Sequence, residues 1–286
     1  MVDKPAGMTS HDVVARIRRL AKTRRVGHGG TLDPMATGVL IIGVNRATRL
    51  LTYVIGSGKS YAATIRLGQA TITDDAEGDV TATVSAAGVA DAGIHAGLAA
   101  QRGEIDQVPS AVSAIKINGE RAYKRVRDGE TVELPPRRVM ISRLDVLAIR
   151  REGDLVDVDI DVDCSSGTYI RAIARDLGAA LGVGGHLTAL RRTAVGRMTL
   201  DEALTLEQLE ERAPDVVGLP MADAARQAFP QRTATVDEAR VLSHGGPLMP
   251  VGIDGPYAVF GPDGDVLAIV SEREGRARAE IVLAPA

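Results

Sequence analysis

The sequence predicts an α/β protein in which helices and strands are mixed, followed by a small β-rich domain. Residues 11–22 place apolar side chains at helical spacing, whereas residues 61–67 and 154–164 alternate as half-buried strands do. After residue 218 the chain consists of short β-like runs separated by Gly, Pro and Asp. We therefore expect a large domain over residues 1–217 and a small one over 218–286, which suits a chain of 286 residues.

The first helix is expected over residues 11–22 with Ser10 as its N-cap, because a serine hydroxyl can accept a hydrogen bond from the free N–H groups of the first turn. Its apolar stripe consists of Val13, Val14, Ile17, Leu20 and Ala21. The segment 26–34 follows, and its three glycines and one proline in nine residues predict an irregular backbone.

The later elements follow from the same patterns. Residues 38–44 form an apolar run that predicts a buried strand. In the strand over 61–67, one face carries Tyr61, Ala63, Ile65 and Leu67. The other expected elements are a helix over 92–102, a strand over 154–164, helices over 169–181 and 201–212, a linker over 212–220, and β runs over 258–260, 266–270 and 279–283.

Two acidic clusters raise the question of metal binding. In the strand over 154–164, aspartates occupy every second position: Asp157, Asp159, Asp161 and Asp163. A solvated sheet face that resists aggregation is favoured over a cation site here. Residues 74–79 form an acidic turn whose spacing loosely fits a calcium loop, but the terminal glutamate is missing, which favours a solvated loop.

The charge distribution is uneven although the net charge is only −3. Residues 1–60 contain ten Lys and Arg against three Asp, so this segment carries +7 and the remainder −10. A basic face on an acidic body can bind a polyanion, and it can equally be a solvated helix face. The chain has no Trp, two Phe and five Tyr, which excludes a protein that stacks base after base of a single strand.

Several other function classes are excluded or disfavoured. One cysteine rules out a disulfide framework and a Cys-rich zinc site, and the five scattered histidines form no metal-ligand pair at helical spacing. Residues 56–60 (GSGKS) imitate a phosphate-binding loop, but position 53 is Tyr where that loop needs Gly. No stretch resembles a signal peptide or a membrane span, so we expect a cytoplasmic protein without a membrane or nucleotide-cofactor partner.

Asp33 lies between the glycine-rich turn and Pro34, just before the predicted buried strand. A lone Asp-Pro is more often an Asx-turn than a catalytic group. The interpretation changes because of a larger set of segments. They are DKPAGMTS at 3–10, GHGGTLDPMATGVL at 27–40, KSY at 59–61 with LG at 67–68, PSAVSAIK at 109–116, CSSGTYIR at 164–171 and LRRT at 190–193.

Together and in this order, these segments closely resemble the TruB family of bacterial tRNA pseudouridine synthases, over nearly all of residues 2–200. The part after residue 218 resembles the family only weakly, where members carry a PUA-like RNA-binding domain. The resemblance implies the pseudouridine-synthase fold, a mixed and largely antiparallel sheet flanked by helices. It also implies an activity: the T-loop uridine of tRNA, conventionally position 55, is flipped out and isomerised to pseudouridine without a metal or organic cofactor.

The resemblance also implies site residues. Asp33 matches the catalytic aspartate, which must be ionised in a closed pocket, and Arg171 matches its guanidinium partner, since a nearby guanidinium opposes the effect of burial on a carboxyl pKa. Tyr61 matches the tyrosine that stacks on the target base and is a candidate proton acceptor. Tyr169 matches a second aromatic residue of the pocket. Without the family resemblance, Arg171 would be interpreted as a surface arginine, and the two tyrosines as residues that pack in the core.

Further positions match substrate-binding or supporting residues of the family. His28 matches the histidine that fills the space left by the flipped nucleotide, although it could simply cap its turn. Leu190 and Lys116 are the other substrate-binding candidates. Lys4 and Pro5 match a motif that supports the active-site loop. Candidate phosphate contacts are the basic residues of 16–25, Lys116, Lys124, Arg125 and Arg191, which would position RNA without reading its sequence.

The sequence also departs from the family pattern. Gly29 stands where Thr or Ser is usual, which adds flexibility and removes a hydroxyl, and Ser110 replaces the second proline of a common Pro-Pro. The strand that normally precedes Asp3 is mostly absent. The main alternative function is a non-catalytic RNA-binding or tRNA-folding protein on the same scaffold. A monomer is expected.

Overall fold

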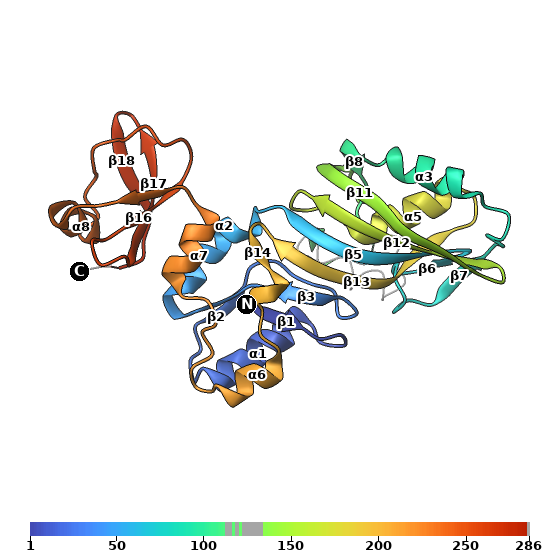
Figure 1. Ribbon diagram of the computed structural model, residues 1–286, viewed down its shortest axis with the longest axis horizontal. Coiled ribbons are helices and arrows are strands. Elements are labelled where there is room, and N and C mark those ends of the chain that lie inside the picture. The colour runs from blue at the N-terminus through green and yellow to red at the C-terminus, as the bar shows by residue number, and fades with distance from the viewer. Residues whose placement is uncertain (112–115, 118–119, 122–133, 285–286) are drawn as a thin grey trace. The chain divides into compact units, whose positions relative to one another are not determined.

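The computed structural model describes residues 1–111, 116–117, 120–121 and 134–284. Helices and strands are mixed along the chain, and a separate sheet forms near the C-terminus (Figure 1), which confirms the predicted mixed α/β class. The chain divides into two compact units. One contains Met1–Asp33, Val39–Ile55 and Val195–Ala286, and the other contains Pro34–Gly38 and Gly56–Ala194. The domain boundary expected between residues 217 and 218 stays a prediction.

The first unit begins with short elements that precede and follow the Asp33 loop. They are β1 (Val2–Lys4), α1 (Ser10–Leu20), β2 (Val26–His28), β4 (Ile42–Val44), the 3-10 helix η1 (Asn45–Leu50), α2 (Leu51–Ile55), β14 (Met198–Thr199), the 3-10 helix η2 (Leu200–Glu202) and α6 (Leu206–Glu211). Strands β2 and β4 pair antiparallel, with His28 opposite Ile42.

Three local predictions need correction. The N-cap of α1 is Thr9, whose side chain accepts from the backbone of Asp12 while Asp12 accepts from the backbone of Thr9, so Ser10 is already helical. The apolar run over 38–44 is interrupted at Ile41, where the chain leaves one sheet for another. The helix expected over 201–212 is instead η2 followed by α6, which starts at its own cap, Thr205. Residues 212–220, expected to form a linker, contain no helix or strand.

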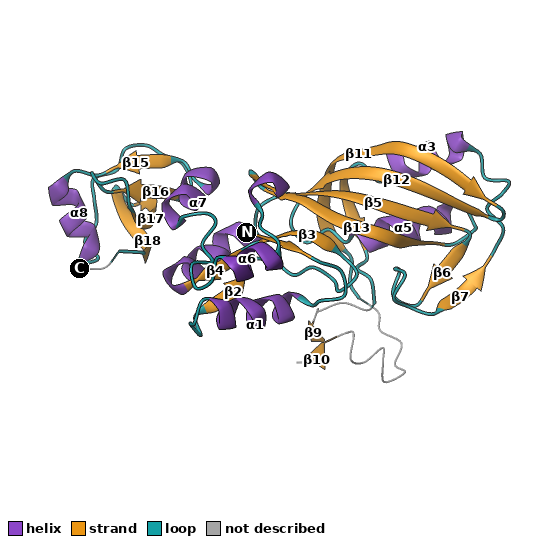
Figure 2. Ribbon diagram, turned by 60° about the horizontal axis from the view of Figure 1, so that its bottom comes forward, coloured by secondary structure: helices purple, strands orange, loops and turns teal. Residues whose placement is uncertain are grey.

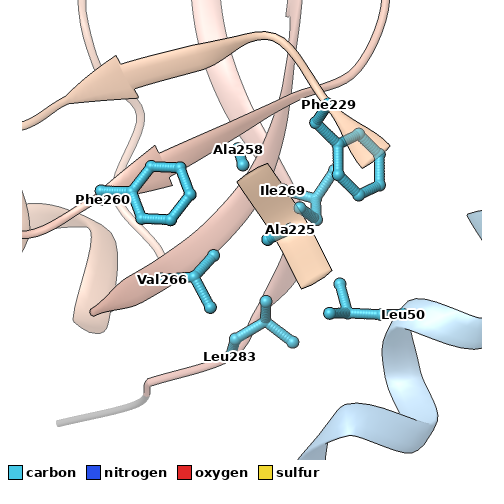
Figure 3. Packing of buried hydrophobic residues seen from close by; sticks show 8 residues of the cluster. All are labelled: Leu50, Ala225, Phe229, Ala258, Phe260, Val266, Ile269 and Leu283. Carbon is cyan, nitrogen blue, oxygen red and sulfur yellow. The ribbon is translucent and has the colours of Figure 1, made fainter. Parts of the chain in front are cut away.

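The C-terminal part of the first unit is a four-stranded sheet with helices on both faces. Its elements are α7 (Met221–Ala228), β15 (Gln231–Thr233), α8 (Val236–Ser243), β16 (Tyr257–Phe260), β17 (Val266–Arg273) and β18 (Arg276–Val282), with the strand order β15-β16-β17-β18. Strand β16 is buried on both faces. Ala258 and Phe260 join a cluster with Phe229 and Leu50 (Figure 3), while Tyr257 and Val259 join a second cluster.

The second unit is built on strands of the large sheet, whose strand order is β1-β3-β13-β5-β12-β11-β8, with β14 paired to β13 outside this path. Figure 2 shows β13, β5, β12 and β11 side by side. The strands not yet given are β3 (Thr37–Leu40), β5 (Lys59–Leu67), β8 (Gly103–Gln107), β11 (Arg137–Glu152), β12 (Leu155–Cys164) and β13 (Gly185–Val195). The β11–β12, β11–β8 and β12–β5 pairs are antiparallel, whereas β13 and β3 are parallel, so the sheet is mixed.

Helices α3 (Asp91–Ala99) and α5 (Ile170–Ala180) pack on this sheet, against β11 and β5 respectively. The smaller pairs β6 (Gln69–Thr71) with β7 (Val80–Thr83) and β9 (Lys116–Ile117) with β10 (Glu120–Arg121) lie outside it. Among the described residues, no helix has the length and apolar character needed to cross a bilayer.

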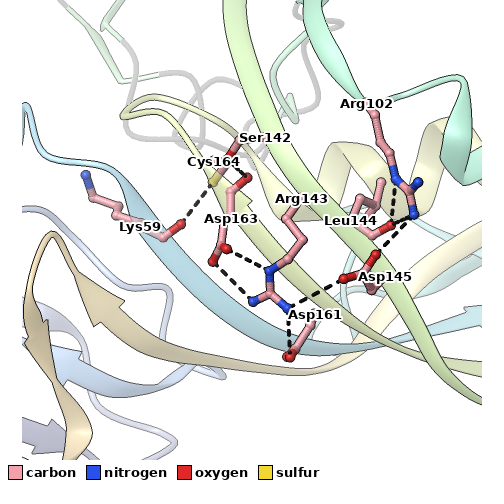
Figure 4. A network of polar contacts seen from close by, with 9 residues as sticks. All are labelled: Lys59, Arg102, Ser142, Arg143, Leu144, Asp145, Asp161, Asp163 and Cys164. Atoms are coloured by element: carbon pink, nitrogen blue, oxygen red, sulfur yellow. Dashed lines mark hydrogen bonds and ion pairs between the residues drawn. The ribbon is translucent and has the colours of Figure 1, made fainter.

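The alternation predicted for β5 and β12 is confirmed. Tyr61, Ala63, Ile65 and Leu67 are all buried, and every second residue of β12 is buried as well. The aspartates of β12 occupy the opposite face, where arginines of neighbouring strands pair with them. Arg66 pairs with Asp157 and Arg150 with Asp159. Arg143 pairs with both Asp161 and Asp163, as Figure 4 shows. The arginine hydrogen bonds hold the pKa of Asp159 and Asp163 below the ordinary range.

Candidate active site

The loop that carries Asp33 connects β2 to β3 and is anchored just before the aspartate. The Ser10 hydroxyl accepts a hydrogen bond from the backbone N–H of Leu32 at 2.8 Å and donates to the carbonyl oxygen of Leu32 at 3.2 Å. Ser10 is only 2 % exposed. The residue expected to cap α1 therefore ties the backbone next to Asp33 to that helix. Asp33 itself is half-buried.

The N-terminal turn in front of Ser10 is organised by Lys4. The side chain of Lys4 is fully buried, and its ammonium group donates to the carbonyl oxygens of Pro5 at 2.8 Å and Met8 at 2.6 Å. A buried ammonium needs such acceptors, because unpaired burial of a charge is costly. Pro5 is exposed. This turn ends at Thr9, the cap of the helix that holds Leu32.

The chain is anchored again five residues after Asp33, where β3 pairs with β13. Gly38 lies opposite Arg192, and its φ of +101° belongs to the region that favours glycine. A Cβ at this position would be 2.2 Å from the carbonyl oxygen of Arg192, so no other residue fits. The Arg191 guanidinium also donates to the Thr37 hydroxyl at 3.2 Å. Leu190, the preceding residue on β13, is buried.

Arg171 lies in the first turn of α5 and is buried, not a surface arginine. Its guanidinium donates to the carbonyl oxygen of Thr73 at 2.8 Å and forms an ion pair with Asp75 at 3.4 Å. The side chains of Arg171 and Asp75 are 6 % and 3 % exposed. Asp75 accepts further hydrogen bonds from the Thr73 hydroxyl and from the backbone N–H of Glu77. The expectation that the acidic turn is merely solvated is therefore wrong for Asp75.

Arg175, which lies one helical turn further along α5, also holds the acidic turn over residues 74–79. It pairs with Asp74 at 3.5 Å and donates to the carbonyl oxygen of Val108 at 2.8 Å. Burial raises the pKa of Asp74 above its ordinary value, with the Arg175 charge acting in the opposite direction. The two arginines thus hold neighbouring aspartates, but Asp75 is the one that contacts Arg171.

The two tyrosines of the candidate site lie in the second unit. Tyr61 is buried on β5, opposite Val162 of β12. Tyr169 is the half-buried N-cap residue of α5. Gln107, at the end of β8, fixes Tyr169 from both sides: its side-chain oxygen accepts from the Tyr169 N–H at 2.8 Å, and its amide donates to the Tyr169 carbonyl at 3.1 Å.

His28 ends β2, half-buried, with its ring edge-on to the His11 ring at a centroid distance of 5.2 Å. The backbone of Lys116 lies in β9, and its side chain is outside the described part, as are Lys124 and Arg125. Among the described residues, no group of three or more His, Cys, Asp or Glu is placed to hold a metal ion.

Lys59 does not belong to a phosphate-binding loop. It starts β5, after α2 and a short turn, and its ammonium donates to the carbonyl oxygen of Ser57 at 2.9 Å. Burial lowers the pKa of Lys59, and the neighbouring positive charge of Arg192 acts in the same direction. Lys59 is half-buried, whereas Arg192 on β13 is only 1 % exposed.

The structure therefore places the candidate residues in two sets. Lys4, His28 and Asp33 belong to the first unit, while Tyr61, Arg171, Tyr169 and Leu190 belong to the second, on β5, α5 and β13. Strands β5 and β13 are neighbours in the sheet, and α5 packs on β5. Sequence reasoning missed the role of three residues that hold others in place, namely Ser10, Asp75 and Gln107. Ser10 lies in a quoted segment and Gln107 lies two residues before one, but Asp75 lies in neither position and has only the acidic turn as a signal.

Comparisons with known proteins place most of the chain in one family. Three family models match: TruB family pseudouridylate synthase (N terminal domain) over residues 18–170, tRNA pseudouridylate synthase B C-terminal domain over 171–215, and tRNA Pseudouridine synthase II, C terminal, over 229–284. Two curated relatives, both called tRNA pseudouridine synthase B, match all of the chain and 96 % of their own length. The protein of Mycobacterium sp. (strain KMS) is 59 % identical, and that of Arthrobacter sp. (strain FB24) is 57 % identical.

Two solved structures are similar to this chain over nearly its whole length. A chain from a Cbf5-Nop10-Gar1 complex is similar with a TM-score of 0.74 at 26 % identity, and the match covers 99 % of this chain and 84 % of that one. A chain from an H/ACA RNP bound to a substrate RNA containing 2'-deoxyuridine gives a TM-score of 0.73 at 25 % identity with the same coverage.

Proposed function

The chain belongs to the TruB family of pseudouridine synthases and is a tRNA pseudouridine synthase; from this premise we propose that it isomerises the T-loop uridine, position 55, with Asp33 as the catalytic carboxylate. The supporting observation is the way in which the Asp33 loop is held. Ser10 fixes the backbone at Leu32, and the Gly38–Arg192 contact fixes the chain five residues after Asp33. A loop fixed on both sides presents its carboxylate in one place, which is what a reaction at a single sugar carbon requires.

The reaction breaks the N1–C1′ bond, turns the uracil, and joins C5 to C1′. N1 gains a proton and C5 loses one, so no oxidant, reductant or cofactor is needed. Attack of the carboxylate on C1′ and a route through a glycal both use an ionised Asp33. In this proposal, Tyr61 packs on the base and is the candidate acceptor of the C5 proton, in which role its hydroxyl proton has to leave first, and Tyr169 forms a second wall of the pocket.

Arg171 is proposed to favour the charged form of Asp33. A guanidinium can do this only if it stays in place, and Arg171 is fixed by Asp75 and the Thr73 carbonyl. The target base must leave the T loop to be reached, which costs a few kcal/mol and less for a loop nucleotide than for a paired one. His28 is proposed to occupy the space left behind, with Lys116 and Leu190 contacting the RNA. Lys4 and Pro5 support the loop through the turn that precedes Ser10.

Exposed basic residues of the first unit are proposed to hold the T arm by its phosphates. Arg19, Lys22, Arg24 and Arg25 are exposed at the end of α1 and in the turn that follows, and Arg46 is exposed at the start of η1. The turn and η1 are joined by a hydrogen bond from the Asn45 N–H to the Arg25 carbonyl at 2.7 Å. We expect the protein to act as a monomer in the cytoplasm, without a cofactor. Residues 1–217 would form the catalytic domain, and residues 218–286 a separate PUA-like domain.

The test is pseudouridine formation in an unmodified tRNA transcript, with wild type, Asp33→Asn and a transcript carrying cytidine at position 55. We expect wild type to convert one T-loop uridine, Asp33→Asn to bind the transcript without converting it, and the cytidine transcript to stay unmodified. Conversion at another uridine would contradict the assigned position. If both proteins bind RNA and neither converts it, the non-catalytic RNA-binding function takes the place of this proposal.

A further inference from the structure

The segment Asn45–Ile55, which contains η1 and α2, lies against β2, which leads into the Asp33 loop, and against its partner β4. A Cβ added to Gly29 would be 3.3 Å from Leu51 Cδ2 and 3.4 Å from Val54 Cγ1, and one added to Gly27 would be 3.3 Å from Leu51 Cδ1. At Gly43 of β4, an added Cβ would meet the Cα of Thr48 at 2.9 Å. Glycines at these positions let the segment touch the β2–β4 backbone itself, so the expected flexibility at Gly29 is replaced by packing.

The same segment contacts the C-terminal sheet. Leu50 belongs to the cluster that also contains Phe229 and Leu283, and Figure 3 shows it reaching toward this cluster from the η1–α2 segment. The Tyr53 ring packs edge-on against the Phe229 ring, with a centroid distance of 5.3 Å. The Arg49 guanidinium donates to the carbonyl oxygen of Val282 at 2.7 Å.

One hydrogen bond in this contact involves a charged acceptor. The Tyr53 hydroxyl donates to Glu280 of β18 at 2.7 Å, and the Ser271 hydroxyl donates to the other carboxylate oxygen at 2.6 Å. Desolvation and Glu280 raise the pKa of Tyr53 to about 12, while the Ser271 and Tyr53 hydrogen bonds lower the pKa of Glu280. At neutral pH a neutral phenol therefore donates to a carboxylate, a stronger bond than one between neutral groups.

We infer that the C-terminal sheet positions the Asp33 loop through the η1–α2 segment, which makes Leu50 and Tyr53 positioning residues for the reaction. They face the C-terminal cluster, whereas Leu51 of the same short segment fills the space beside Gly27 and Gly29, and Val54 the space beside Gly29. Close-packed segments shift as units, so a change at the cluster reaches the loop backbone. The inference rests on the proposed role of Asp33.

The experiment compares full-length variants that change the cluster from the segment side with variants that change the C-terminal domain alone. Leu50→Ala and Tyr53→Phe act on the segment. The matched controls are Leu242→Ala, in the second cluster of the C-terminal sheet, which does not contain Leu50, and Tyr257→Phe, whose hydroxyl donates to Glu272 at 3.1 Å within that sheet. Each variant is measured for single-turnover rate at saturating tRNA, RNA affinity, melting temperature, and hydrogen exchange of the amides of residues 27–33.

We expect Leu50→Ala to slow the single-turnover step on the order of tenfold, since small displacements of a catalytic group are costly, and to raise hydrogen exchange in the loop. Tyr53→Phe keeps its packing volume and should show the same changes to a smaller degree. RNA affinity should stay at the wild-type value. Leu50→Met, which refills the cluster, should restore the rate, and the two controls should lose melting temperature without changing rate or loop exchange.

A wild-type rate and wild-type loop exchange in Leu50→Ala and Tyr53→Phe would overturn the inference, and so would equal slowing in the controls. Loss of RNA affinity with an unchanged saturated rate would assign the C-terminal sheet to binding alone and overturn it as well. Wild type and Asp33→Asn are run beside the variants. If wild type is inactive, the proposed function fails, whereas loop exchange still decides whether the segment holds the loop.

Discussion

Replacing Asp75 with asparagine removes one charge from a buried pair and leaves the size of the side chain unchanged. The Arg171–Asp75 distance of 3.4 Å corresponds to an attraction of about 5 kcal/mol at an effective dielectric constant of about 20. Arg171 keeps its hydrogen bond to the Thr73 carbonyl, and an amide can still accept from Glu77 N–H, so the loss falls toward the lower end of the roughly 3–5 kcal/mol seen when one member of a buried pair is removed. We expect a melting temperature lower by about 6–12 °C.

The effect on chemistry should exceed the effect on RNA binding. In Asp75→Asn, Arg171 is no longer held in place, and we expect the single-turnover rate of pseudouridine formation to fall roughly a hundredfold. A shift of about 1 Å at a catalytic group is enough for such a loss. Asp74→Asn is the matched control. Asp74 pairs with Arg175 instead of Arg171, so its neutral replacement should keep the wild-type rate. If Asp75→Asn reacts as fast as wild type while Asp33→Asn is inactive, the reasoning that Asp75 positions Arg171 is refuted.

Three further outcomes follow from the geometry. Gly38→Ala should lower the free energy of unfolding by about 3 kcal/mol or more, because the added Cβ clashes with Arg192. Gly103→Ala is the control: Gly103 has a φ of +87° but open space around it, so only backbone strain lowers the free energy of unfolding, by about 1–2 kcal/mol. Equal losses in urea titrations would contradict the close contact at Gly38. Removing Arg24 and Arg25 together should reduce the slope of log RNA affinity against log salt by about 2, and an unchanged slope would show that neither contacts phosphate. The stabilisation that Glu280 gives over Glu280→Gln should be complete above pH 4.5, the ordinary pKa of a glutamate, and shrink as pH falls through its lowered folded pKa; a difference that grows in acid would have the wrong sign.

Sequence patterns were sufficient where the structure repeats one environment along an element. Strands β5 and β12 alternate between a buried and a less buried face, so period-two alternation predicted their faces, and their bounds to within two residues. The same reasoning failed over residues 38–44, because Ile41 separates a strand of the large sheet from a strand paired with β2. A change of sheet within one apolar run leaves no local signal.

Side-chain roles were less predictable than elements, because partners are distant in the sequence. Residue type favours Ser10 over Thr9 as a cap. Only the structure shows that Thr9 caps the helix, while Ser10 holds the loop through its contact with Leu32, 22 positions away. Asp75 has the composition of a solvated turn, and its partner Arg171 lies in a helix of another motif.

Gly29 shows why a family resemblance alone does not describe a site. As an isolated departure from the family pattern, a glycine in place of Thr or Ser indicates a looser loop with one hydroxyl fewer. In the fold, Gly29 is buried, its N–H donates to the Ile41 carbonyl at 2.8 Å, and Leu51 and Val54 fill the space where a side chain would lie. The rigidity of the loop at this position is therefore supplied by the η1–α2 segment. The residue that packs over Gly29 is Leu51, which lies in none of the segments that carry the family resemblance.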